Sequence, residues 1–351
     1  MFLKNCWYVA AWSHEVECEK IFARKLLNED VILYRRQDGT PAAMVNRCPH
    51  RLAPLSLGRI EDDCVRCMYH GLLFNSDGDC VEVPQQDRIP PNLTVKTFPL
   101  VERDKLIWIW MGDPALADES SVPDAHWLDS PDWAYAPGYI KYDNANFMLI
   151  VDNLLDFSHL GYVHETTIGG KGNSGLIKPK VERFDWGVRI TRQYTDDDIP
   201  PFIRGIAKFE GKTDRWQIYD WHVAGNILSM DSGNAPAGTG AFDGEASPLT
   251  LRFHSYQALT PESETSTHYF WAQTHDFEID NPQMSQAIAD QVRNAFGEDR
   301  EIIEAQQVVL KNFPDAKMNP IGADAALNQV RWLLNKKLEA ERSLTQESSN
   351  G

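Results

Sequence analysis

Residues 151–164 place two histidines and two aspartates in an otherwise apolar run. On an α-helix, Asp156 and His159 share one face, whereas His164 lies about 140° around the axis from His159. Both imidazoles can therefore bind one ion only if the helix bends or ends between them, where Gly161 lies. Two imidazoles and one carboxylate form the facial triad of oxygen-activating non-haem iron. A buried helix whose histidines bond to backbone carbonyls is the alternative.

A third ligand is expected in a late helix, predicted over residues 283–311. Asp299 lies in the middle of the apolar stripe of this helix, whereas Glu301 lies opposite and Glu298 about 100° away. A lone carboxylate on a buried face is costly unless it is paired or coordinates a metal, so Asp299 is the candidate. The apolar stripe comprises Ile288, Val292, Ala295, Phe296, Ile302 and Ile303.

A second group of potential ligands consists of Cys48, His50, Cys67 and His70, arranged as C-x-H and C-x₂-H. Two thiolates and two imidazoles can bind one structural zinc. They can instead hold a [2Fe–2S] cluster with both thiolates on one iron and both imidazoles on the other. The C-x-H spacing is unusually tight for structural zinc, which favours the cluster.

The composition limits the class of protein. A chain of 351 residues with 42% hydrophobic residues is long enough for two globular domains. A net charge of −17 argues against nucleic acid or an anionic membrane surface as partner. We find no signal peptide and no apolar run of about 20 residues, and expect a cytoplasmic protein. Clustering of four of the six cysteines between Cys48 and Cys80 favours metal binding over disulfides.

The elements expected to position these residues indicate an α+β protein. Short strands dominate residues 1–115 and predict a small all-β domain. Proline-rich residues 115–138 are interpreted as a crossing between domains. Residues 116–342 predict a larger domain in which an antiparallel sheet is flanked by helices. Residues 343–351 are expected to be a disordered tail. The main strands of the larger domain are expected within residues 188–192, 216–222, 251–259 and 267–273.

The cysteine and histidine spacing leads to a family resemblance. Arg51 follows the first pair, and Gly71-Leu72 follows the second, so the chain matches C-P-H-R…C-x-Y-H-G-L. This pattern resembles that of Rieske clusters. Cys64 and Cys80 fall outside the pattern, and we interpret Cys64 as a packing residue.

A Rieske motif followed by D-x₃-D-x₂-H-x₄-H resembles the terminal oxygenase component of Rieske non-haem iron oxygenases. The resemblance implies a helix-grip-like second domain with His159, His164 and the Asp299 of a Glu-Asp pair as iron ligands. It also implies a homotrimer in which the cluster of one subunit serves the iron of its neighbour. The Asp156 carboxylate would link the two centres, accepting a hydrogen bond from His70 across the interface and holding His159.

The chain lacks a convincing nicotinamide or flavin site. Residues 170–175 fit G-x-G-x-x-G, but they follow a helix and no βαβ unit surrounds them, so the match is interpreted as chance. Electrons are therefore expected from a separate NAD(P)H-dependent reductase carrying flavin and an iron–sulfur centre.

Within this family, Asn153 and residues 214–217 and 259–262 resemble the vanillate O-demethylase oxygenase group. The resemblance implies oxidation of a methyl group on an anionic arene. O-demethylation of a vanillate-like methoxybenzoate is the first expectation. Methyl hydroxylation of 4-toluenesulfonate or a related aryl sulfonate or carboxylate is the alternative, and ring hydroxylation or dihydroxylation is the third.

Candidate substrate contacts are Asn153, His222 and Gln257. Gln257 stands near the position where some demethylases have a histidine, which puts a carboxylate-binding histidine in doubt. His222 ends a strand and could bind the anion, although a solvent-facing histidine is an equal alternative. Two other functions remain, a small Rieske electron carrier and a structural zinc protein. The long second domain with its own ligand set argues against both.

Overall fold

The computed structural model describes residues 1–168, 177–243 and 247–350, with side chains as far as residue 344. The residues of the G-x-G-x-x-G match lie outside this part. Two compact units result, the first comprising Met1–Pro123 with Thr260–Glu264, the second Asp124–Leu259 with Thr265–Gly351. The boundary expected from the sequence lay after residue 115. Among the described residues, no helix is both long and apolar enough to cross a membrane.

The first unit is built from short antiparallel strands in three small sheets, ordered β1-β10-β9, β2-β3-β4 and β5-β6-β7-β8. Large aromatic side chains such as Tyr8, Tyr34 and Trp108 fill its core. The strands are β1 (Trp7–Trp12), β2 (Phe22–Leu26), β3 (Glu29–Arg35), β4 (Pro41–Val45), β5 (Arg59–Glu61), β6 (Cys64–Arg66), β7 (Leu73–Phe74), β8 (Cys80–Glu82), β9 (Leu100–Arg103) and β10 (Leu106–Trp110). The expected all-β domain is confirmed.

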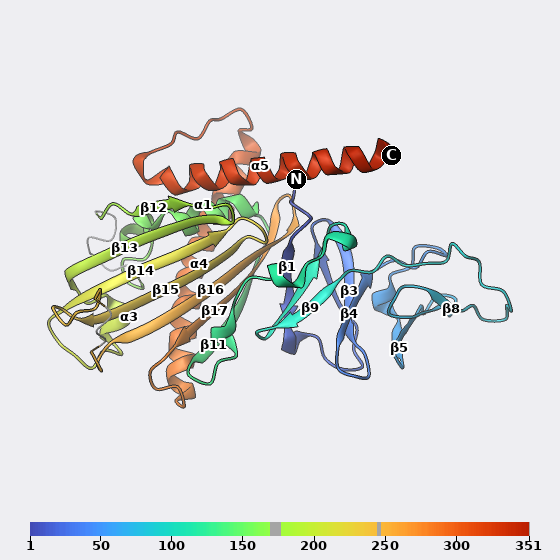
Figure 1. Ribbon diagram of the computed structural model, residues 1–351, viewed down its shortest axis with the longest axis horizontal. Coiled ribbons are helices and arrows are strands. Elements are labelled where there is room, and N and C mark those ends of the chain that lie inside the picture. The colour runs from blue at the N-terminus through green and yellow to red at the C-terminus, as the bar shows by residue number, and fades with distance from the viewer. Residues whose placement is uncertain (169–176, 244–246, 351) are drawn as a thin grey trace. The chain divides into compact units, whose positions relative to one another are not determined.

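The second unit contains a seven-stranded antiparallel sheet, ordered β11-β17-β16-β15-β14-β13-β12 (Figure 1). Its strands are β11 (Ala134–Tyr142), β12 (Lys180–Arg183), β13 (Gly187–Asp198), β14 (Lys212–His222), β15 (Ile227–Pro236), β16 (Leu251–Ser263) and β17 (Ser266–His275). All four strands expected from alternation are present, and the sequence missed β11, β12 and β15.

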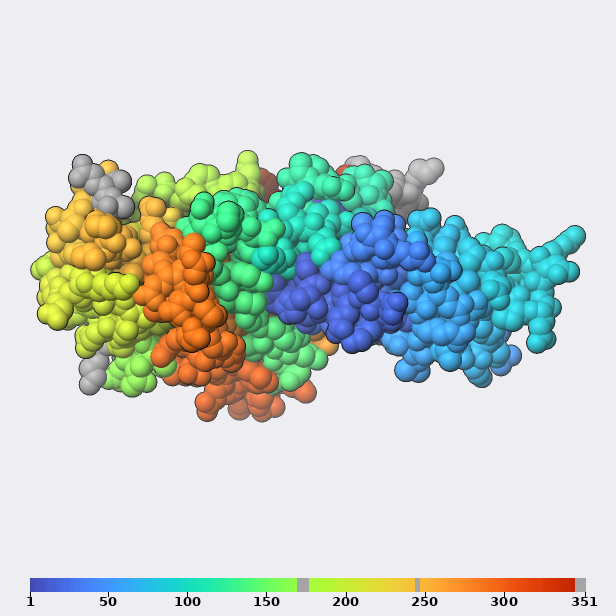
Figure 2. All heavy atoms as spheres, turned by 90° about the horizontal axis from the view of Figure 1, so that it is seen from below, coloured from blue at the N-terminus to red at the C-terminus, as the bar shows by residue number. Residues whose placement is uncertain are grey.

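The helices of the second unit are α1 (Phe147–Leu155), α2 (Leu160–Val163), α3 (Pro201–Arg204), α4 (Pro282–Asn312) and α5 (Ala325–Asn350). The long helix α4 begins at the N-cap Asn281, whose side chain accepts a hydrogen bond from the Met284 backbone N–H, with Pro282 in the first turn. It runs beside β11 and β17, with its other side on the surface of this unit (Figure 2).

Two expectations about helices were wrong. Ile302 is 52% exposed, because it lies about 60° from Asp299 around α4, just beyond the edge of the buried stripe. α5 continues to Asn350, where a disordered tail was expected from Ser343. Residues such as Leu344 are compatible with a helix, so polarity alone did not mark its end.

Candidate functional site

The first expected ligand segment is broken at Asp156 and not at Gly161. Helix α1 ends there, and Asp156 adopts an extended backbone with φ −116° and ψ 94°. Its carboxylate accepts hydrogen bonds from the backbone N–H (2.9 Å) and hydroxyl (3.0 Å) of Ser158. A 3₁₀ turn over Phe157–His159 and the short α2 follow, and His164 caps α2. These short turns replace the continuous helix that would hold the imidazoles apart.

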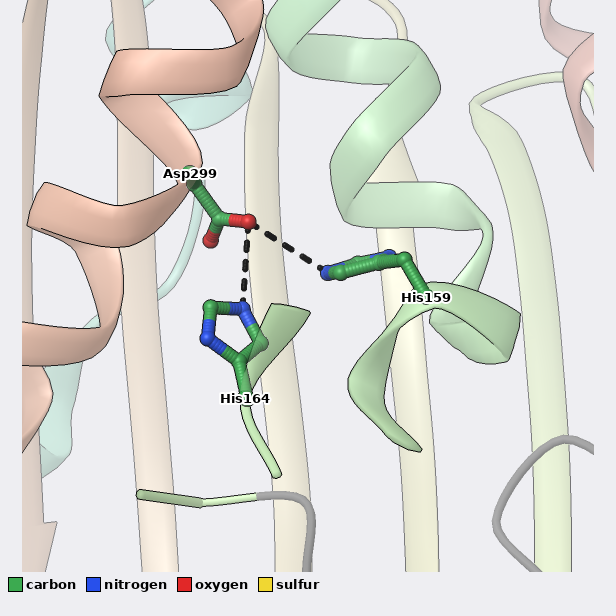
Figure 3. Close-up of side chains that lie close together, drawn as sticks. All are labelled: His159, His164 and Asp299. Atoms are coloured by element: carbon green, nitrogen blue, oxygen red, sulfur yellow. Dashed lines mark hydrogen bonds and ion pairs between the residues drawn. The ribbon is translucent and has the colours of Figure 1, made fainter. Parts of the chain in front are cut away.

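His159, His164 and Asp299 converge on one point (Figure 3). One potential ligand atom from each residue lies within 4.8 Å of the other two. Asp299 Oδ1 is 3.1 Å from His164 Nε2 and 3.5 Å from His159 Nε2. His164 is fully buried and Asp299 is 4% exposed, so the burial expected for this carboxylate is confirmed. Two imidazoles and a carboxylate at this spacing fit a divalent iron ion with coordination positions left open.

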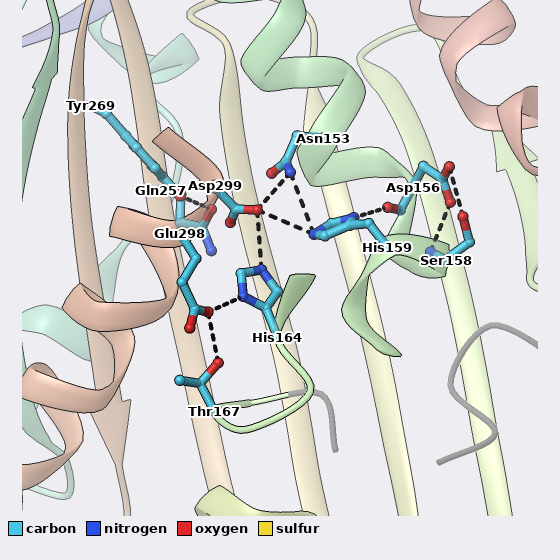
Figure 4. Close-up of polar contacts among 10 residues, drawn as sticks. All are labelled: Asn153, Asp156, Ser158, His159, His164, Thr167, Gln257, Tyr269, Glu298 and Asp299. Atoms are coloured by element: carbon cyan, nitrogen blue, oxygen red, sulfur yellow. Dashed lines mark hydrogen bonds and ion pairs between the residues drawn. The ribbon is translucent and has the colours of Figure 1, made fainter. Parts of the chain in front are cut away.

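The other ring nitrogens are held by neighbouring oxygens (Figure 4). His159 Nδ1 lies 2.5 Å from the Asp156 backbone carbonyl, so the backbone of Asp156, and not the expected carboxylate, orients this ring. His164 Nδ1 lies 2.6 Å from Glu298 Oε2, which also accepts a hydrogen bond from Thr167 Oγ1 at 2.8 Å. Such contacts leave both Nε2 atoms facing the metal position.

Electrostatics favour a positive charge at this point. Burial alone would lower the pKa of His164, but the carboxylates of Asp299 and Glu298 together raise it above its ordinary value. Asn153 Nδ2 donates to Asp299 Oδ1 at 2.8 Å and lies 3.4 Å from His159 Nε2. Asn153 thus fixes the position of the carboxylate.

The triad opens into a cavity of about 150 Å³ between the helices and the sheet. A cavity of this size accommodates a benzene ring. Asn153 and Gln257 line it, as expected for substrate contacts. Gln257 accepts a hydrogen bond from the Tyr269 hydroxyl (2.5 Å) and donates one to Ser255 Oγ (3.0 Å).

His222 does not belong to this cavity. Side chains alternate across a strand, and β14 directs Arg215, Gln217 and Tyr219 to one face of the sheet and His222 to the other. The His222 ring stacks on Trp186 with centroids 4.7 Å apart. Its expected contact with the substrate is therefore wrong, because the strand-end position hid which face it occupies.

In the first unit, Cys48, His50, Cys67 and His70 lie on two loops of matching backbone geometry. In each loop the cysteine carbonyl accepts from the N–H four residues later, at 2.9 Å from Leu52 and 3.0 Å from Gly71. Both thiols are buried, and burial raises the pKa of the Cys48 thiol. The exposed imidazoles lie with their centroids 4.6 Å apart. Buried sulfur and exposed nitrogen fit a [2Fe–2S] cluster with its histidine-bound iron outward.

Comparison with known families identifies both units. The Rieske [2Fe-2S] domain family matches residues 6–99. The vanillate O-demethylase oxygenase C-terminal domain family matches residues 144–340, more than half of the chain. The chain belongs to the Rieske non-haem iron oxygenases of the vanillate O-demethylase family. It is an oxidoreductase with a [2Fe–2S] cluster and a mononuclear iron as cofactors.

Relatives span nearly the whole of this Rieske oxygenase. It is 51% identical over 98% of its length to the iron-sulfur subunit of the toluene-4-sulfonate monooxygenase system of Comamonas testosteroni, covering 99% of that protein. It is 34% identical over 97% of its length to a vanillate O-demethylase oxygenase subunit of a Pseudomonas species, covering 96% of that protein. The crystal structure of dicamba monooxygenase bound to dicamba is 31% identical, with a TM-score of 0.88, covering 97% of this chain and 99% of that one.

The relatives are oxygenase components of multicomponent systems, as is this Rieske oxygenase.

Sequence reasoning missed two residues around its triad. Glu298 was placed away from the buried stripe, although it adjoins Asp299 and a histidine needs an acceptor for its second nitrogen. Thr167 carried no signal, because a threonine after the histidine motif has many other uses.

Proposed function

We propose that this oxygenase hydroxylates the methyl group of a methyl-substituted aryl sulfonate such as toluene-4-sulfonate. The observation that carries the proposal is the convergence of two imidazoles and a buried carboxylate on a ring-sized cavity. The relative that is 51% identical, a subunit of a toluene-4-sulfonate monooxygenase system, supports a sulfonate as substrate. The sequence analysis gave this substrate as the alternative and not as the first expectation. Gln257 lines the cavity near the position where some demethylases have a histidine. The absence of that carboxylate-binding histidine at this position agrees with a sulfonate.

His159, His164 and Asp299 are proposed as the iron ligands, in agreement with their donor set and spacing. An iron ion held by these three residues would supply oxygen activation. Asn153 holds Asp299 in place, and Glu298 holds the ring of His164. The cavity wall positions the methyl group near the triad and excludes water. One oxygen atom enters the methyl group, and the other leaves as water with two electrons and two protons.

Cys48, His50, Cys67 and His70 are proposed to hold the cluster. Their support is the pairing of buried thiols with exposed imidazoles on two matching loops. The two electrons come from a separate NAD(P)H-dependent reductase with flavin and an iron–sulfur centre. A homotrimer, in which Asp156 accepts a hydrogen bond from the partner's cluster histidine, completes the proposal; its support is the family resemblance.

The test is a single turnover with chemically reduced, iron-loaded protein, after removal of the reductant. Toluene-4-sulfonate and vanillate are supplied with O₂ in separate reactions. A hydroxymethyl product from the sulfonate, at a yield above that of formaldehyde from vanillate, is expected. The second candidate function is O-demethylation, which the 34% relative favours. Formaldehyde from vanillate with no product from the sulfonate would establish it instead.

A further inference from the structure

Four polar side chains form a block on the cavity side of two adjacent strands. Gln217 of β14 pairs with Ser232 of β15, and Arg215 pairs with Asn234 in the next row. All four line the cavity that contains the triad. The triad comes from the helices, and this polar block comes from the sheet, so the two lie on different walls of one cavity.

Several polar atoms of the block have no hydrogen-bond partner among the described residues. The Tyr194 hydroxyl donates to Gln217 Oε1 at 3.3 Å, which leaves the Gln217 amide nitrogen to donate elsewhere. Gln217 and Ser232 are half-buried and line the cavity, and within the described residues the Gln217 amide nitrogen and the Ser232 hydroxyl remain available to donate to a ligand there. The buried Asn234 Oδ1 has no hydrogen-bond partner in this part of the chain. Buried polar groups are normally paired, and exchanging the oxygen and nitrogen of the Asn234 amide would place a third donor in the block, which suits a ligand with several acceptor atoms.

One positive charge belongs to the block, and a second lies beside it. Arg215 is paired with Asp197, Nε to Oδ2 at 2.9 Å. Arg192, in register with Gln217, is 5% exposed and donates to the Tyr219 hydroxyl. Its Nε has no partner, and no carboxylate pairs with it within the described part of the chain. A buried guanidinium without a counter-ion is costly, and an anion at the block would offset that cost.

We propose that the polar block binds the sulfonate group of the substrate, with Gln217 and Ser232 as the residues that determine specificity for the anion. This inference rests on the proposed function. The three oxygens of a sulfonate accept hydrogen bonds from the Gln217 amide, the Ser232 hydroxyl and a rotated Asn234 amide. The positive charges of Arg215 and Arg192 attract the negative charge of the sulfonate. The ring then spans the cavity, and the methyl group faces the triad.

The test compares the binding of toluene-4-sulfonate with that of the neutral, similarly shaped toluene-4-sulfonamide. Isothermal titration calorimetry is performed on the oxidised holoprotein with both metal centres loaded. The wild type is expected to bind the sulfonate at least about tenfold more tightly. Gln217→Leu and Ser232→Ala should each weaken sulfonate binding about tenfold, which corresponds to about 1.4 kcal/mol, and weaken sulfonamide binding by a smaller factor of about threefold, because hydrogen bonds to a charged acceptor are about twice as strong as those to a neutral one. In turnover, the loss should appear in KM with kcat unchanged.

Matched control residues lie on the opposite face of the sheet, on β15 itself and on β13, the neighbour of β14. Ser229→Ala on β15 and Gln193→Leu on β13 remove the same groups outside the cavity, and should leave both affinities unchanged. Cluster absorbance and iron content report folding, and Ser232→Ala tests the inference alone if Gln217→Leu does not fold.

Wild-type sulfonate affinity in a folded Ser232→Ala or Gln217→Leu variant, from a protein that oxidises toluene-4-sulfonate, would overturn the inference and leave the proposed function intact. A wild type that neither binds nor oxidises the sulfonate but demethylates vanillate would overturn both.

Discussion

Glu298 offers a sensitive test of how the iron site is held. Its carboxylate accepts a 2.6 Å hydrogen bond from His164 Nδ1, and His164 Nε2 faces Asp299 at 3.1 Å. Glu298→Gln keeps the shape and removes the charge. The neutral amide oxygen is a weaker acceptor, so His164 becomes a less basic ligand and its ring is held less firmly.

The expected magnitude follows from the exposure of this contact. Removing a carboxylate behind a metal-bound histidine costs about 10- to 100-fold in metal affinity, or about 1.4 to 2.7 kcal/mol. The Glu298 side chain is 33% exposed, so water can replace part of the lost hydrogen bond. We therefore expect a loss near tenfold for Glu298→Gln, and a larger loss for Glu298→Ala, which also leaves Thr167 Oγ1 without its acceptor.

The assay is anaerobic equilibrium dialysis of iron(II) against protein that retains its cluster. The matched control is Glu301→Gln, an exposed glutamate on the same helix that contacts no ligand. Its iron affinity should equal that of the wild type. Equal affinity of Glu298→Gln and wild type, or an equal loss in Glu301→Gln, would refute the role assigned to Glu298.

Three further predictions concern the second unit. Asp299→Asn should abolish iron(II) binding but keep the visible absorbance of the cluster, and retention of both would argue against this ligand. Burial raises the pKa of Asp152 to about 6 despite its ion pair with Arg331. The folded protein thus holds a proton that the unfolded chain releases between about pH 4 and 6, and stability falls as the pH rises through this window. In urea titrations at a series of pH values, Asp152→Asn should remove up to about 3 kcal/mol of this fall in the free energy of unfolding. The same dependence of the free energy of unfolding on pH in the variant and the wild type would count against the prediction. Gly233→Ala would place a Cβ 2.2 Å from the Trp216 ring and should lower the free energy of unfolding by about 1–3 kcal/mol. Gly297→Ala, in open space on α4, should raise it by about 1 kcal/mol, and similar effects of the two changes would contradict the packing argument.

Candidate ligands could be named from the sequence where the chemistry constrains spacing tightly. The two Cys–His pairs fix a metal site almost alone, and the family match bears out the cluster. Asp299 followed from a different principle, because a carboxylate centred on an apolar stripe demands a partner. Both signals are local in sequence and need no knowledge of the tertiary structure.

Other features depended on information that local patterns lack. Strand β15 was missed because its cavity face carries Ser232 and Asn234 among apolar residues, which breaks the alternation expected of a half-buried strand. β11 begins in the segment interpreted as a crossing, since Pro137 is tolerated on an edge strand. His222 was a candidate substrate contact with a solvent-facing histidine as the equal alternative, and the sequence could not decide between them because a strand end gives no phase for the alternation.

The central claim is that the triad in the second unit directs one atom of O₂ into a substrate methyl group. Its most direct test is a single turnover of reduced holoprotein with toluene-4-sulfonate under ¹⁸O₂, followed by mass spectrometry of the product. Wild type should give the hydroxymethyl product with one ¹⁸O atom, and Asp299→Asn should give none. A product without label, or an equal labelled yield from Asp299→Asn, would contradict the assignment of the site.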